Sequence, residues 1–184
     1  MLRKRNSRIE MILRNLIRQN FPRKEPFEIW DLPMEIKVDD LSRPEVIALL
    51  NEHLRHMIAI TPRGCVHALD IEALKKPEIT FWSVWEGSTL RGCGALKQLD
   101  PYHAEIKSMR TAATCQKKGV ASHLLQFILD EARKRRYRRV SLETGSYEAF
   151  IPARNLYEKF GFTCCEPFAD YTENSHSVFM TMTL

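Results

Sequence analysis

The sequence lacks several features that would assign it to common classes of protein. No apolar run approaches the roughly 20 residues of a membrane-spanning helix. Neither CxxC nor the phosphate-binding patterns GxxxxGK[ST] and GxGxxG occurs. Five cysteines without a secretory signal argue for a reducing compartment, so we expect a cytoplasmic protein. A membrane span, a structural zinc site and the better-known nucleotide loops are therefore not expected, and the 184 residues suffice for one domain with a sizeable core.

The excess of positive charge is confined to the N-terminal end of the chain. Residues 1–26 hold eight Lys/Arg and two Glu, a net charge of +6, whereas the remainder holds 20 basic and 21 acidic residues, a net charge of −1. Because the body is close to neutral, nucleic-acid binding by it is not implied. The basic run at 133–139 is interpreted as a solvated helix end, with contact to a nucleic acid or a coenzyme 3′-phosphate as the alternative.

We divide the chain into a basic extension, residues 1–33, and a domain, residues 34–184. Within the extension, residues 1–20 carry an apolar stripe that predicts a short amphipathic helix, with members Ile9, Ile12, Leu13, Leu16 and Ile17. Three interpretations stay open: packing on the domain or a partner subunit, binding to an acidic surface or membrane, or an incorrectly assigned translation start with Met34 as the true one.

The domain shows alternating strand and helix patterns. One helix is predicted to begin with Ser42 as its N-cap and Pro44 in its first turn. It carries His53 and His56, with Glu52 beside them. We interpret the two histidines as surface or substrate-cleft residues, because a metal site needs more ligands. The elements read in the order β-α-α-β-β-β-α-β-α-β-β. The expected strands and helices centre on 35–38, 44–58, 69–74, 79–85, 90–96, 104–111, 120–132, 140–144, 152–159, 162–165 and 178–184.

One strand–turn–helix unit organises this order. The strand at 104–111 leads through a turn with two lysines and one glycine into a helix with a single apolar face: Val120, Leu124, Leu125, Ile128, Leu129 and Ala132. Such a turn directs backbone N–H groups and the positive end of a helix dipole at one point, which suits a pyrophosphate. An ordinary strand–turn–helix is the alternative.

Two motifs in this region resemble a known family. Gln116, Gly119 and Ala121 occupy the defining positions of the Gln/Arg-x-x-Gly-x-Gly/Ala signature of the GCN5-related N-acetyltransferases, the GNAT family. The segment 153–162 resembles that family's A-x-x-L-Y-x-x-x-G-F segment. The resemblance covers residues 34–184 and implies an α/β fold with a mixed, mostly antiparallel central sheet flanked by helices.

The resemblance also implies acetyl-CoA as cofactor and places its binding residues. The pantetheine arm would pair with the main chain of Met109, Arg110 and Thr111. The pyrophosphate would be held by the loop and first helical turn: Gln116, Lys117, Lys118, Gly119, Val120, Ala121 and Ser122. Phe150 stands where many members carry an asparagine that contacts the cofactor, and Asn155 is the candidate replacement.

Two residues are candidates for the chemistry of acetyl transfer. Tyr157 matches the family tyrosine that protonates the leaving thiolate, with a core aromatic as the alternative. Glu105 lies eleven residues before Gln116, the spacing of the catalytic glutamate in the histone acetyltransferase branch, and is the predicted base. A structural glutamate paired with Lys107 or Arg91 is the alternative. His103 and Glu143 are held in reserve.

The expected function is N-acetylation of a small-molecule amine, with no metal. The first alternative is acetylation of a protein lysine or N-terminus, and the second is a non-catalytic acyl-CoA-binding regulatory module. The acceptor depends on the first two helices, the turn at 145–150 and the loop at 170–176, which vary within this fold. A homodimer is a candidate assembly.

Overall fold

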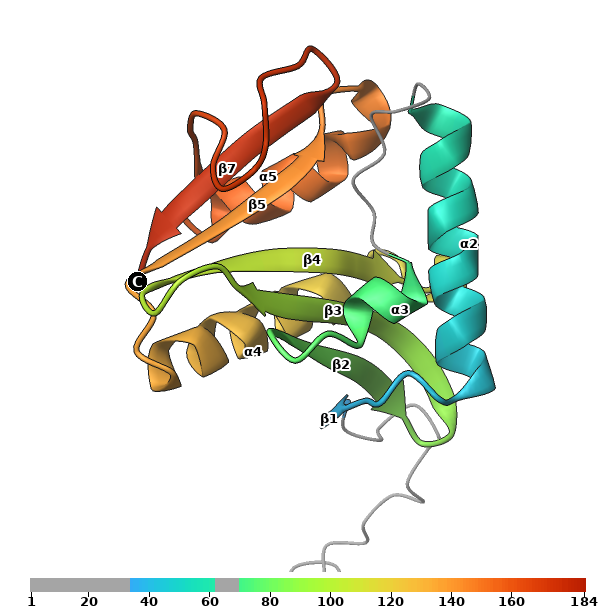
Figure 1. Cartoon of the computed structure of the whole chain (residues 1–184). Helices are drawn as coiled ribbons and strands as arrows, with labels where there is room; N and C mark the ends of the chain where they lie inside the picture. The colour runs from blue at the N-terminus through green and yellow to red at the C-terminus, as the bar shows by residue number, and fades with distance from the viewer. Residues whose placement is uncertain (1–33, 62–69) are drawn as a thin grey trace, which may run out of the picture. The chain divides into compact units, whose positions relative to one another are not determined.

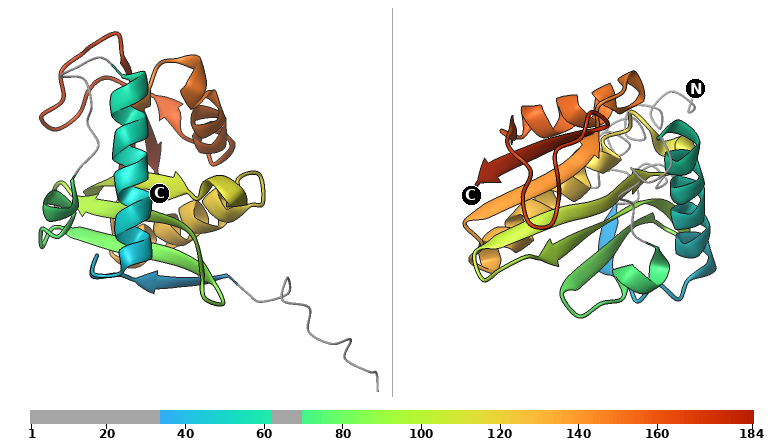
Figure 2. Two further views of the ribbon diagram at one scale, coloured as in Figure 1. Left: turned by 90° about the vertical axis from the view of Figure 1, so that its right-hand side faces the viewer. Right: turned by 45° about the horizontal axis from the view of Figure 1, so that its top comes forward.

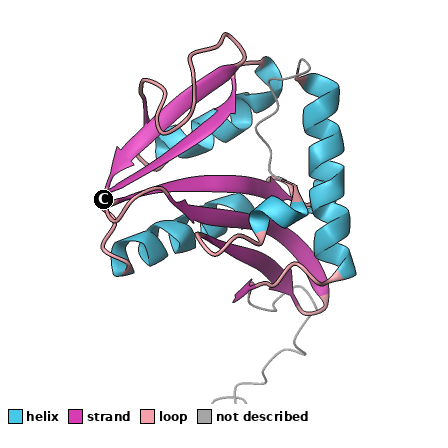
Figure 3. Cartoon of the chain, viewed as in Figure 1, coloured by secondary structure: helices cyan, strands magenta, loops and turns pink. Residues whose placement is uncertain are grey.

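The computed structural model describes residues 34–61 and 70–184, and its element order is the one predicted from the sequence. A seven-stranded sheet, in the order β1-β2-β3-β4-β5-β7-β6, is flanked by helices (Figures 1 and 3). The strands are β1 Glu35–Val38, β2 Ile79–Glu86, β3 Thr89–Gln98, β4 His103–Thr111, β5 Arg139–Gly145, β6 Thr163–Cys164 and β7 Ser177–Thr183. The helices are α2 Pro44–Ile60, α3 Ile71–Leu74, α4 Val120–Lys134 and α5 Ile151–Lys159.

The expected N-terminal helix and the extension 1–33 lie outside the described residues. In the described ranges no helix is both long enough and apolar enough to cross a membrane. The same ranges hold no group of three or more metal-ligating side chains placed to bind an ion.

The sheet opens between its two central strands. All neighbouring strands are antiparallel except β4 and β5, which pair in parallel over four residues, His103–Ile106 with Arg139–Leu142. Beyond Ile106 the two strands no longer pair with each other, although β4 still pairs with β3 and β5 with β7. Ser108 on β4 has a φ of 52°, in the left-handed region. The strands therefore diverge toward α2, which runs across this end of the sheet (Figures 1 and 2).

Helix α4 supplies the main core on one face of the sheet. All six residues of its predicted apolar stripe are buried, none more than 3% exposed. They pack with Trp82, Leu96, Ile106 and Leu142 from four strands. Burial of each large aliphatic side chain stabilises the fold by about 1.5–3 kcal/mol, so this face holds β3, β4 and β5 in register.

Helices α2 and α3 supply a second core. Val46, Leu49, Leu50 and Leu74 pack with the side chains of β2 that alternate with Trp82, including Phe81 and Trp85. Successive strand residues face opposite sides of a sheet, so this cluster covers the face opposite α4. Helix α2 is thus fixed by its N-terminal half, and its C-terminal half extends toward the gap between β4 and β5 (Figure 2).

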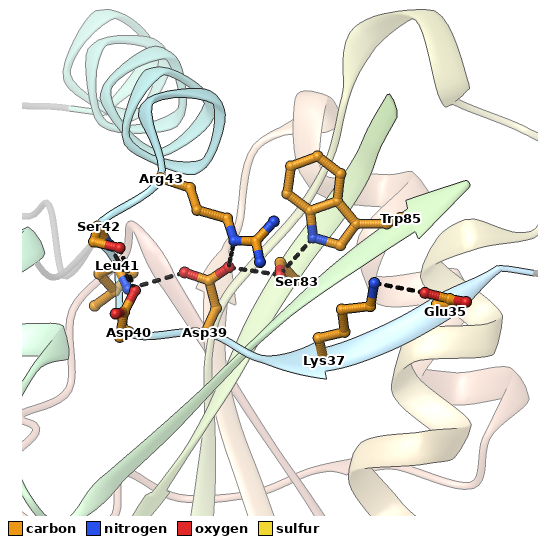
Figure 4. A network of polar contacts seen from close by, with 9 residues as sticks. All are labelled: Glu35, Lys37, Asp39, Asp40, Leu41, Ser42, Arg43, Ser83 and Trp85. Atoms are coloured by element: carbon orange, nitrogen blue, oxygen red, sulfur yellow. Dashed lines mark hydrogen bonds and ion pairs between the residues drawn. The ribbon is translucent and has the colours of Figure 1, made fainter. Parts of the chain in front are cut away.

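A buried polar network holds the corner between β1 and α2 (Figure 4). Asp39 accepts hydrogen bonds from the Leu41 N–H at 2.9 Å and the Ser83 hydroxyl at 2.8 Å. The Ser83 oxygen in turn accepts from Trp85 Nε1 at 2.8 Å. The guanidinium of Arg43 lies over the Trp85 ring, 5.2 Å from its centroid. This network ties the start of α2 to β2.

The predicted N-cap of α2 was wrong. Arg43 occupies that position without a capping side-chain bond, and Pro44 opens the helix as expected. The Ser42 hydroxyl instead donates to Asp40 at 2.6 Å. Because Asp39 already fixes the corner through its buried carboxylate, the chain enters α2 one residue later than the serine suggested.

Candidate active site

An exposed loop joins β4 to the N-terminus of α4. It passes through a 3-10 turn, Ala113–Cys115, and then through Lys117 and Gly119, whose φ angles of 60° and 81° are left-handed. No side chain caps α4, and its first turn holds no acidic residue. A Cβ atom at Gly119 would meet nothing within 4 Å, so open space lies beside the uncapped N–H groups. The loop has the geometry and charge of an anion-binding helix N-terminus.

The predicted cofactor residues fall into two adjoining groups and one outlier. Gln116, Lys117, Lys118 and Gly119 are exposed in the loop, Val120 is buried, and Ala121 and Ser122 are half-buried in the first turn. Met109, Arg110 and Thr111 lie in the part of β4 that is not paired with β5. Asn155 is exposed on α5 and lies apart from both groups in the sequence, so its cofactor role stays a prediction.

Arg91 on β3 anchors the loop, a contact that sequence reasoning missed. Its Nη1 donates to Cys115 Sγ at 3.0 Å, and its main-chain carbonyl accepts from the Ala112 N–H at 2.9 Å. The same guanidinium is paired with Glu86. Burial raises the pKa of the Cys115 thiol, but hydrogen bonds from Thr114 and Arg91 outweigh burial, so the pKa is lowered. Arg91 therefore pairs with Glu86 and the loop, and not with Glu105.

A cavity of about 210 Å³ lies between the diverging strands β4 and β5. Helix α2 and β4 form one wall, with His53, His56, Lys107 and Arg110 among their lining residues. The wall from β5 and α5 includes Glu143, Phe150 and Tyr157. Of the predicted site residues, Met109, Arg110 and Tyr157 line the cavity.

Tyr157 is placed by α5 with its ring buried and its residue on the cavity wall. It is 7% exposed and packs against Phe162. Burial, and then the negative charge of Glu143, raise the pKa of the Tyr157 phenol. The hydroxyl thus stays protonated at neutral pH and can give a proton to a strongly basic group.

Phe150 packs so closely on Gly145 that a Cβ atom at Gly145 would lie 2.3 Å from the Phe150 ring.

The wall from α2 and β4 joins residues far apart in the sequence. Arg110 Nη2 lies 2.9 Å from Glu52 Oε1, and Arg110 Nη1 lies 3.4 Å from His56 Nδ1. Burial, followed by the charges of Arg110 and His56, lowers the pKa of His53 to about 4. His53 is therefore neutral at pH 7. The interpretation of both histidines as cleft residues agrees with this geometry.

Comparison with known proteins decides the family. The model of the GNAT acetyltransferase family matches residues 43–162. The chain belongs to this family. It is 60% identical over 151 residues to the uncharacterized N-acetyltransferase YsnE of Bacillus subtilis. The aligned region covers 82% of this chain and all of that protein. It is 50% identical over 149 residues to the uncharacterized N-acetyltransferase YedL of Escherichia coli, across 81% and 94% of the two chains.

Solved structures agree on the fold. A Bacillus subtilis acetyltransferase in complex with CoA superposes with a TM-score of 0.58 at 19% identity, over 83% of this chain and 99% of that one. An Elizabethkingia anophelis GNAT acetyltransferase with acetyl-CoA bound also gives 0.58, at 19% identity, over 82% and 98%. This GNAT protein is thus an acetyltransferase with acetyl-CoA as co-substrate.

The residues of this acetyltransferase fit acetyl-CoA. The uncapped α4 N-terminus, the open space at Gly119 and the exposed Lys117 and Lys118 suit a pyrophosphate. On its β5 side, the stretch of β4 beyond Ile106 has no strand partner, so it offers main-chain groups to the pantetheine amides. When bound, acetyl-CoA supplies an acetyl group activated as a thioester.

Glu105, the predicted base, lies in a closed ion pair. Its Oε1 accepts from the Tyr171 hydroxyl at 2.7 Å and lies 3.1 Å from Lys107 Nζ, and the residue is 1% exposed. Burial, and then the charge of Glu105, raise the pKa of Tyr171. The alternative pairing of Glu105 with Lys107 is confirmed. Glu105 does not line the cavity, so its role as base stays a prediction.

Of the two reserve residues, the structure brings only Glu143 to the cavity. Glu143 is half-buried on β5, and its Oε1 accepts a hydrogen bond from the Ser177 hydroxyl at 2.7 Å. His103 is 5% exposed and is bonded to Ser141 at 2.8 Å and Arg139 at 3.0 Å, outside the cavity lining. The strand pattern placed Glu143 at the end of β5, and only the opening of the sheet shows that it faces the same space as Tyr157.

Proposed function

We propose that this acetyltransferase transfers the acetyl group of acetyl-CoA to the amine of a small molecule. The observation that carries the proposal is the cavity of about 210 Å³ that Glu143 and Tyr157 both line. Its walls come from α2, β4, β5 and α5, and its volume suits a compact acceptor better than a peptide segment. A protein lysine or N-terminus would have to enter the same restricted space.

In this proposal Glu143 removes a proton from the acceptor amine, and Tyr157 gives a proton to the leaving thiolate. Glu143 is an acceptor that remains accessible from the cavity while Ser177 fixes one of its oxygens. The raised pKa of Tyr157 keeps its hydroxyl protonated at neutral pH, so a proton is available beside the leaving group. Each such proton transfer typically contributes 10²–10⁴-fold to the rate. Direct attack by the amine needs no covalent enzyme intermediate, in line with the lack of an obvious nucleophile–base pair.

The test is a screen of small amines and peptides for acetyl-CoA-dependent acetylation, followed by three variants on any substrate found. We expect Glu143→Gln and Tyr157→Phe to lower kcat by about 10²-fold or more, with the affinity for acetyl-CoA within about twofold of the wild type. Glu105→Gln is expected to lower kcat less than Glu143→Gln does, since Glu105 lies outside the cavity. Calorimetry with acetyl-CoA provides the binding control.

Three results would contradict the proposal. A larger loss of kcat in Glu105→Gln than in Glu143→Gln would reassign the base to the residue predicted from the sequence. Acetylation of peptides alone would make the acceptor a protein. Binding of acetyl-CoA without turnover of any amine or peptide would favour the non-catalytic module.

A further inference from the structure

Polar side-chain atoms that have no hydrogen-bond partner among the described residues gather at the cavity. Among the described residues, four buried side-chain atoms lack a hydrogen bond: His53 Nδ1, Arg91 Nε, Ser108 Oγ and Arg110 Nε. Three of these four belong to residues that line the cavity. A buried donor or acceptor without a partner destabilises the fold, so native proteins keep few of them. Three such atoms on one wall of the cavity indicate that a polar group of a ligand forms the missing hydrogen bonds.

The charge of this wall indicates the sign of that group. Arg110 is 16% exposed, and its guanidinium contacts Glu52 through Nη2, while Nε stays unpaired. Glu52 is itself 48% exposed, so water screens much of its charge. The carboxylate among the cavity-lining residues, Glu143, belongs to the opposite wall. The α2/β4 wall therefore presents an incompletely neutralised cation to the cavity.

The unpaired atoms match the oxygens of a carboxylate. An arginine guanidinium binds carboxylates through parallel N–H donors, and Nε is one of the donors in that fork. The Ser108 hydroxyl can donate to the same group, and a neutral His53 can donate from Nδ1 in one of its tautomers. A neutral amide or hydroxyl would leave the arginine charge without a counter-charge on this side.

We propose that the acceptor is an amine that also carries a carboxylate, held at the α2/β4 wall by Arg110, Ser108 and His53. This inference rests on the proposed function, because it orients the amine toward Glu143 and Tyr157 on the opposite wall. The two ends of such a molecule would contact opposite walls of the cavity: the carboxylate would bind Arg110, and the amine would lie beside Glu143. The substrate class is thus short amino acids.

The experiment compares acids with their carboxamides. A panel of short α-, β- and γ-amino acids, each with its carboxamide, is titrated by calorimetry into the protein saturated with CoA, and the same compounds are assayed for acetylation. We expect at least one acid to bind tenfold or more tightly than its carboxamide. Arg110→Gln should weaken that acid at least tenfold and leave the carboxamide within twofold.

Matched variants keep the result interpretable. Arg55→Gln removes an exposed arginine from α2, where its Nε donates to the Asn51 carbonyl, and should change no affinity. Ser108→Ala removes one unpaired hydroxyl and should weaken the acid about threefold, which provides a second test if Arg110→Gln does not fold.

The outcomes separate this inference from the proposed function. Acids that bind through Arg110 but are not acetylated would support the carboxylate site and overturn the proposed acetylation of small amines. Acetylation of carboxamides as efficiently as of acids would support the proposed function and overturn the carboxylate site. Equal weakening of both compounds by Arg110→Gln, or no binding of any acid, would also overturn it.

Discussion

The predicted cofactor loop, residues 116–122, and the proposed acceptor site at the α2/β4 wall of the cavity would bind their ligands by different means. The loop is one continuous segment whose useful groups are main-chain N–H donors, and its path requires left-handed φ angles at Lys117 and Gly119. The wall is built from side chains, and its central contact joins Arg110 to Glu52 across 58 residues of sequence. Donor binding thus depends on local backbone geometry, whereas acceptor binding depends on how distant elements are placed.

This difference explains why the two halves of the site should respond differently to substitution. Backbone donors are lost when the chain path changes, whatever side chains are present. Side-chain donors are lost one at a time, or together when the helix that carries them shifts. Variants that separate these two responses test the comparison directly.

The largest expected effect is on the loop. Gly119→Val places a β-branched residue at a φ of 81°, a conformation that costs about 1–3 kcal/mol, and puts side-chain atoms into the space beside the α4 N-terminus. We expect the affinity for CoA to fall about 100-fold, close to 2.7 kcal/mol. Calorimetry with CoA measures it.

Gly161→Val provides the matched control. Gly161 also has a left-handed φ, of 94°, and a Cβ there would come no nearer than 3.8 Å to Met182, but it lies after α5 and away from the loop. Both variants should lose similar stability, and only Gly119→Val should lose CoA binding. Equal affinities in the two variants would show that the loop does not hold the pyrophosphate.

The sequence predicted the local half of the molecule well. The order of elements and the buried face of α4 follow from periodicity, and the loop follows from the motif around Gln116, Gly119 and Ala121. These features depend on residues within a few positions of one another, so their physical basis is visible in the chain itself. The family comparison and the fold confirm them.

The acceptor half was less predictable because it depends on tertiary contacts. The residues near Glu105 in the sequence do not predict that Tyr171, 66 residues away, donates a hydrogen bond to its carboxylate. Ser42 looked like an N-cap, yet the carboxylate that fixes the corner is Asp39, bonded to Ser83 on β2. The cavity itself exists because β4 and β5 stop pairing, and a strand pattern does not show where pairing ends.

The next effect concerns the support of the acceptor wall. Ser83→Ala removes the hydroxyl that joins Asp39 to Trp85, so Trp85 Nε1 loses its acceptor and the buried Asp39 carboxylate keeps the hydrogen bond from Leu41 but loses the one from Ser83. We expect a loss of about 2–3 kcal/mol in the free energy of unfolding, measured by denaturant titration. Because the network fixes the start of α2, the KM for the acceptor should rise about threefold while the CoA affinity stays unchanged.

Ser42→Ala is the control for this network. The Ser42 hydroxyl is exposed and bonds only to Asp40 among the described contacts, so its loss should cost less than about 0.5 kcal/mol. A comparable loss of stability in the two variants would show that the buried network does not fix α2. A fall in CoA affinity in Ser83→Ala would show that the loop and the wall are mechanically linked.

The smallest effect is a pH dependence that belongs to the wall alone. The pKa of His53 is lowered from 6.5 to about 4 by burial and by Arg110 and His56, against the opposing charge of Glu52. Lys107, Glu143 and His176 line the same cavity. Below pH 6.5 the unfolded chain therefore binds a proton that folded His53 does not, so stability falls as the pH falls toward 4 and levels off below it. Between pH 7.5 and 5 this contribution amounts to about 2 kcal/mol.

His53→Gln isolates that contribution, because the variant has no proton to bind at this position. The difference in unfolding free energy between wild type and variant, measured by denaturant titration at pH 7.5 and pH 5, should shift by about 2 kcal/mol in favour of the variant at the lower pH. A constant difference would mean that His53 binds its proton equally well in the folded state, and the wall would then be open to water. CoA affinity should not follow this titration, since the loop's donors are main-chain N–H groups that do not ionise. A parallel loss of CoA affinity between pH 6.5 and 4 in the wild type, absent from His53→Gln, would join the two halves of the site that the fold otherwise keeps separate.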